Sequence, residues 1–146
     1  MQSLNFNEGY KEFCINNDET RIIRFSPADY GLLERFSQAK KAITETVNGL
    51  ERRVNVDLKG NSEDEIDETA EILAELRKLI FEQINYIFDA DVALVVFGNK
   101  SPVSQVKGKF LFERFFESAG PFIEKEIKAE MEASQKRIAK YTKQVR

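Results

Sequence analysis

The chain of 146 residues contains no histidine, no tryptophan and a single cysteine, Cys14. Without histidine it lacks the commonest general base and the commonest metal ligand of proteins. One cysteine excludes an internal disulfide framework and a cysteine-based zinc site. Catalysis or metal binding would therefore depend on Asp, Glu, Lys or Tyr alone. We predict that the chain has no catalytic, cofactor-binding or metal-binding residues and is not an enzyme.

Long apolar runs are absent as well. The longest one, residues 92–97, is far shorter than the roughly 20 residues needed to span a bilayer. The segment from Met1 to Asn5 has neither the basic start nor the apolar stretch of a secretory signal. Hydrophobic residues make up 42% of the chain and charged residues 32%, with a formal net charge of −3. These values indicate one cytoplasmic domain that is large enough to bury a core.

The first 25 residues predict β-structure. Two β-capable runs, residues 10–15 and 20–25, flank the sequence Asn16-Asn17-Asp18-Glu19. Asn and Asp tolerate the left-handed backbone of tight turns, so these runs predict a β-hairpin. Residues 4–6 could pair as a third strand. Because an isolated hairpin is only marginally stable in water, we expect this one to pack on a helix.

A long helix is expected after the hairpin. Ser26 can serve as its N-cap, Pro27 fits its first position, and Asp29 complements the positive end of the helix dipole. Apolar residues then recur at steps of three and four, which predicts a helix of about 28 residues. The positions in this stripe are Leu32, Leu33, Phe36, Ala39, Ile43, Val47, Leu50 and Val54.

A second long helix is predicted to begin at Ser62, with Glu65 as the partner of a capping box. The acidic residues at 63–75 are interpreted as a solvated helix N-terminus rather than a metal site. The apolar stripe of this helix comprises Ile66, Ala70, Leu73, Leu76, Ile80, Ile84 and Ile87. Residues 92–97 fit a buried strand or a short helix that starts at Asp91 and stops at Gly98. The helix is favoured because no partner strand adjoins it.

Residues 109–119 predict a further helix that is rich in phenylalanine. We expect part of this set to close the core and part to form a partner-binding patch. The set is Phe110, Phe112, Phe115 and Phe116. Gly120 and Pro121 are expected to break or kink the helix, because proline clashes with the preceding turn. Residues 103–108 are expected to form a loop.

The expected fold is mainly α, a bundle of about three to five helices with a small N-terminal hairpin and a long amphipathic C-terminal helix. Within this single domain, residues 1–25 form the hairpin, residues 26–119 the helical core and residues 121–146 the C-terminal helix. Removal of the chain from Gly120 onward is expected to leave a folded remainder that no longer binds a partner.

The C-terminal segment carries a narrow seam at alternating steps of four and three residues, which would either dock a partner or pack back on its own domain. The predicted partner-binding residues are Phe115, Phe116, Phe122, Ile127, Met131, Ile138, Tyr141 and Val145. Beyond Ser134 the charged residues are all basic, whereas residues 57–89 are rich in acids. This asymmetry allows head-to-tail self-association. The negative net charge argues against nucleic-acid binding.

The order of these segments resembles the small tail assembly chaperones of long-tailed bacteriophages and prophages. The resemblance rests on the strand pair at 10–15 and 20–25, the sequence SPADY at 26–30 opening a long helix, the helical body, and the loop FGNKSP at 97–102. It implies a non-enzymatic protein without cofactors that binds the tape-measure protein in the host cytoplasm during tail assembly. A structural virion subunit (tail-completion or connector) and a small regulatory protein-binding module remain alternatives.

Overall fold

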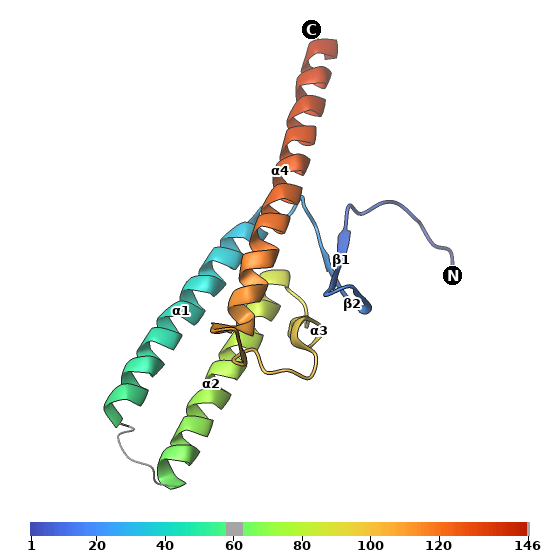
Figure 1. Ribbon diagram of the computed structural model, residues 1–146. Coiled ribbons are helices and arrows are strands. Elements are labelled where there is room, and N and C mark those ends of the chain that lie inside the picture. The colour runs from blue at the N-terminus through green and yellow to red at the C-terminus, as the bar shows by residue number, and fades with distance from the viewer. Residues whose placement is uncertain (58–62, 146) are drawn as a thin grey trace.

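The computed structural model describes residues 1–57 and 63–145, with side chains described at 1–50 and 65–143. Two long antiparallel helices lie side by side, and a third long helix crosses them (Figure 1). A short helix packs against the second long helix and the N-terminal hairpin. This confirms the predicted mainly helical fold with an N-terminal hairpin and a long C-terminal helix. The helices are α1 (Gly31–Asp57), α2 (Glu63–Phe88), α3 (Ala93–Phe97) and α4 (Leu111–Val145).

The predicted hairpin is present, formed by β1 (Lys11–Ile15) and β2 (Asp18–Phe25). Asn16 and Asn17 have φ angles of 51° and 62°, the left-handed geometry of the two-residue turns that join antiparallel strands. The strand register shifts after Cys14. The third strand expected at residues 4–6 is not formed, because that segment finds no apolar surface to cover and its side chains are exposed.

Helix α1 begins at Gly31 and not at Ser26, so the predicted N-cap is wrong. The backbone N–H of Asp29 donates to the carbonyl of Ser26 at 3.0 Å, which makes a turn before the helix. The Asp29 carboxylate accepts a hydrogen bond from Arg35 at 2.7 Å, and Arg35 Nε also donates to the carbonyl of Ile87 at 3.0 Å. Arg35 therefore ties the turn before α1 to the end of α2. The side chain of Val54 lies outside the described residues.

The short helix predicted at 92–97 is confirmed as α3, although its cap comes from elsewhere. Asn85 Oδ1, on α2, accepts hydrogen bonds from the N–H groups of Val92 and Ala93, both at 2.8 Å. Asp91, the predicted cap, instead contacts the Asn85 amide at 3.3 Å. Gly98 ends the helix with a φ of 60°, as predicted. The cap predicted at Ser62 for α2 lies outside the described residues.

Helix α4 continues through Gly120 and Pro121, so the break predicted there is wrong, and a single helix crosses the expected boundary between core and C-terminal segment. An interior proline costs a helix about 3 kcal/mol. Ile123 and Ile127, directly beyond it, are fully buried, and each contributes roughly 1.5–3 kcal/mol by its burial. Continuing the helix is therefore favourable. Before α4, the loop predicted at 103–108 contains part of a minimal ladder of β3 (Gln105–Val106) and β4 (Lys109–Phe110).

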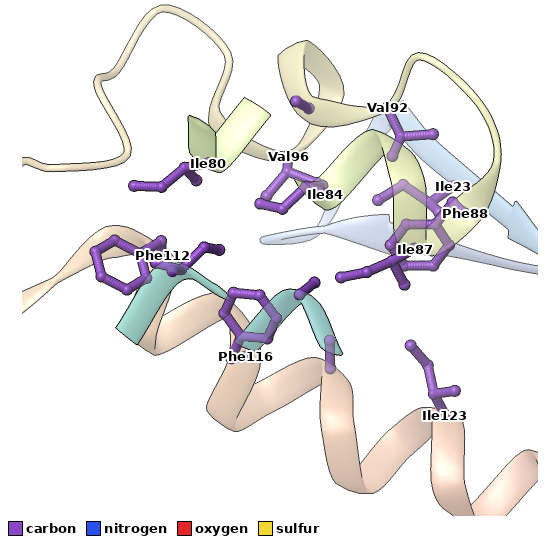
Figure 2. Packing of buried hydrophobic residues seen from close by; sticks show 14 of the residues in the cluster. Ile23, Ile80, Ile84, Ile87, Phe88, Val92, Val96, Phe112, Phe116 and Ile123 are labelled. Carbon is purple, nitrogen blue, oxygen red and sulfur yellow. The ribbon is translucent and has the colours of Figure 1, made fainter. Parts of the chain in front are cut away.

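The core lies where α1, α2, α3, α4 and the hairpin meet. Figure 2 shows Ile80, Ile84 and Ile87 of α2 turned toward Phe112 and Phe116 of α4, with side chains of the hairpin and α3 closing one end. The predicted role of part of the phenylalanine set in closing the core is thus confirmed. In the described part of the chain, no helix has the length and apolar character needed to cross a membrane.

Candidate partner-binding surfaces

Two of the predicted partner-binding residues, Phe116 and Ile127, belong to the core, so their assignment to a partner-binding surface is wrong. Phe116 is 6% exposed and Ile127 is fully buried. Phe116 packs edge to face against Phe36 of α1, with ring centroids 5.0 Å apart. Neither residue can contact a partner without unfolding. The spacing of the apolar residues correctly predicted one apolar face along this helix. It could not show which half of that face is covered by the rest of the domain.

Three further predicted residues lie on the part of α4 that projects beyond the body (Figure 1). Met131 is 39% exposed, Ile138 65% and Tyr141 68%. All other described side chains from 128 to 143 are exposed too, except that of Ser134, which is half-buried. The side chain of Val145 is outside the described residues. This exposed apolar row, Met131, Ile138 and Tyr141, is called the α4 seam below.

The remaining two predicted residues, Phe115 and Phe122, line a groove with a cavity volume of about 710 Å³. Its walls come from β1 and the hairpin turn, from the end of α3 and the loop after it, and from the first turns of α4. Ring contacts hold these walls in place. The Phe13 and Phe122 centroids are 5.4 Å apart, and those of Phe97 and Phe115 are 6.4 Å apart. The groove is thus built from three segments distant in sequence.

Three cationic side chains and no carboxylate line this groove: Arg21, Lys100 and Arg114. Arg21 of β2 donates to the carbonyls of Val95, at 2.9 Å, and Val96, so it binds the C-terminal end of α3. Arg114 donates to the carbonyl of Val106 at 2.7 Å. These partners are neutral, and in the described part of the chain no carboxylate lies within ion-pair distance of the three cations.

The charges of Arg21 and Arg114 also act on two carboxylates outside the groove lining, those of Asp18 and Glu117. Two hydrogen bonds from Thr20, first its hydroxyl and then its N–H, lower the pKa of Asp18, and the charge of Arg21 adds to this. The pKa of Glu117 is lowered mainly by a hydrogen bond from Lys109, with Arg114 as a smaller cause. Asp18 and Glu117 thus partly offset the charges of Arg21 and Arg114 from outside the lining, while the cations border the groove itself.

Sequence reasoning identified Phe115 and Phe122 but missed the cations of the groove. Arg21 lies in a strand, Lys100 in a loop and Arg114 in a helix, and no local spacing connects them. Cys14 is exposed and also lines the groove. Over the described residues, no three His, Cys, Asp or Glu side chains are placed to hold a metal ion together.

No protein-family model, curated protein or solved structure matches this chain.

Proposed function

We propose that this protein is a non-enzymatic assembly chaperone that binds an amphipathic helix of a long client, as a tail assembly chaperone binds a tape-measure protein. The observation that carries the proposal is the continuity of one apolar row along α4. Ile123 and Ile127 are buried by the body, and the same helical face continues into the exposed Met131, Ile138 and Tyr141. The body covers the first half of the row and leaves the second half open for a partner.

The spacing of the row favours a helical partner. Met131 and Ile138 are seven residues apart, as are Ser134 and Tyr141, and the steps between them alternate between three and four. This is the repeat by which two helices pack along a shared seam. A seam with only a few exposed apolar side chains favours reversible binding, which suits a chaperone that must release its client.

Charge favours a client helix with acidic residues beside its apolar face. After Ser134 the charged residues of the sequence are Lys136, Arg137, Lys140, Lys143 and Arg146, with no acid among them. Charges at the edges of a helix–helix contact govern partner choice and orientation more than affinity. The basic end of α4 would thus select the client, while the seam supplies the binding energy.

Co-expression with the tape-measure protein of the same phage or prophage tests this proposal. We expect the wild-type chain to keep that protein in solution and to copurify with it. Ile138→Ser should abolish copurification, since a mostly exposed side chain can be replaced without unfolding the body. Glu132→Ser is the matched control, because it places the same new side chain at an exposed position of the same helix, outside both the seam and the basic set.

Two results would contradict the chaperone assignment. One is copurification that survives the double substitution Ile138→Ser and Tyr141→Ser. The other is a stoichiometric amount of the chain in purified phage particles, because a chaperone leaves the assembly and a structural virion subunit stays in it.

A further inference from the structure

We propose that the groove beside the hairpin binds an extended peptide segment in which acidic residues alternate with apolar ones, added as a third strand to the outer edge of β1. This site is separate from the α4 seam, and neither proposal depends on the other. Three features of the groove carry the inference: an open strand edge, an apolar floor and a lining with three cations and, among the described residues, no carboxylate.

The strand edge is the first feature. Among the described residues β1 pairs with β2 alone, so its other edge has no strand partner. Four consecutive residues, Phe13 to Asn16, line the groove. Three of them, Phe13 to Ile15, are successive residues of β1, whose side chains alternate between its two faces, as expected where a groove reaches the main chain at the edge of a strand. Such an edge offers unpaired N–H and C=O groups to an added strand.

The floor is the second feature. The apolar side chains that line the groove include Phe13, Ile15, Phe97, Leu111, Phe115 and Phe122. In a strand added at this edge, every second side chain would point toward this floor. The cavity volume of about 710 Å³ is within the range of roughly 300–1,000 Å³ typical of ligand sites. The floor accordingly accepts apolar side chains at alternate positions of the peptide.

The charge is the third feature, and it defines the chemistry of the partner. Arg21 and Arg114 are held by neutral carbonyls, and among the described residues the Lys100 side chain makes no hydrogen bond or ion pair. With no carboxylate in the lining, acidic residues of a peptide are attracted and basic ones repelled. A mixed acidic and apolar strand therefore fits this groove, and a basic one does not.

Fluorescence anisotropy with defined peptides tests the inference. The probes are short fluorescein-labelled peptides in which Glu alternates with Val, Leu or Phe, and twin peptides with Lys in place of Glu. We expect at least one of the acidic peptides to bind and the Lys twins not to. Lys100→Glu should weaken binding by roughly tenfold or more, since it replaces an attraction by a repulsion. Lys41→Glu, on the exposed face of α1, is the matched control and should leave binding unchanged.

Two further measurements distinguish strand addition from non-specific binding of the peptide. Because only alternate amides of an added strand face its neighbour, N-methylation of every second amide should block binding in one register and spare it in the other. Bound peptide should also slow alkylation of Cys14 by iodoacetamide, read by mass spectrometry, since Cys14 lines the groove. Failure of every acidic peptide to bind, equal binding of the Lys twins, or equal binding of the two methylated peptides would overturn the proposal.

Discussion

The backbone of Gly120 on α4 lies directly against the ring of Phe36 on α1. A Cβ atom at position 120 would be only 3.3 Å from Cε1 of Phe36 and 3.4 Å from its Cζ. The ring of Phe36 in turn packs against Phe116, which is part of the core. The close approach of α1 and α4 therefore depends on the absence of a side chain at position 120.

Gly120→Leu is expected to destabilise the protein by roughly 1–3 kcal/mol, because an extra side chain in a packed contact forces neighbours out of place. The free energy of unfolding in urea measures the effect. The matched control is Gly49→Ala on α1, where an added Cβ meets nothing within 4 Å. That change should raise the free energy of unfolding by about 0.5–1 kcal/mol, because alanine has a higher helix propensity than glycine. If both substitutions raise the free energy of unfolding, there is room for a side chain between position 120 of α4 and Phe36 of α1.

Arg21→Met is expected to cost about 1–3 kcal/mol of stability, since it leaves the carbonyls of Val95 and Val96 without their donor at the end of α3. Arg24→Met is the control on the same strand. The ion pair of Arg24 with Glu12 is exposed and 3.6 Å long, so its loss should cost less than about 1 kcal/mol. Equal urea midpoints for the two variants would show that Arg21 does not hold α3 in place.

Removing residues 131–146 should leave the folded body intact, because the last fully buried side chain of α4 is Ile127. Removing residues 120–146 also deletes Ile123 and Ile127, each worth roughly 2–5 kcal/mol, and should unfold the protein. This corrects the expectation that a remainder ending before Gly120 would fold. Circular dichroism with thermal unfolding compares the two. If the variant that lacks residues 131–146 is unfolded, the tip of α4 packs on its own body.

Thr20→Val is expected to raise the pKa of Asp18 toward its ordinary value. The hydroxyl of Thr20, 2.6 Å from Asp18 Oδ1, is the main reason that this pKa is low. A carboxyl group whose pKa is lower in the folded state stabilises the fold above its ordinary pKa, and that contribution is lost as the pH falls through the lowered value. NMR titration of the carboxyl carbons measures the shift. Thr46→Val, on α1, should leave the titration of Asp18 unchanged.

Local patterns predicted most of the elements but not how they cap and cross one another. The turn at Asn16 and Asn17 could be predicted because residue type alone favours left-handed backbone. The start of α1 could not, because Asp29 is held by Arg35, and Arg35 also bonds to Ile87 on another helix. Likewise α3 is capped by Asn85 from α2, which no spacing near residues 92–97 reveals.

The same limit explains what was missed in the candidate surfaces. Periodicity identified the row that contains both Ile127 and Ile138, but it cannot tell that the body ends between them. The proline rule failed at Pro121 because the burial of Ile123 and Ile127 outweighs the hydrogen bond that proline removes. Lys100 and Arg114 share a groove only because the loop after α3 returns to the start of α4.

Helix α4 passes the hairpin, whose Phe13 contacts Phe122, and ends well clear of the body (Figure 1). Residues 129–145, at 1.5 Å of rise each, carry its tip roughly 25 Å past the last buried turn. A client helix bound to the α4 seam and a peptide bound beside β1 would therefore not collide. If both proposals hold, a single copy of the chain would bind both partners at once and connect them.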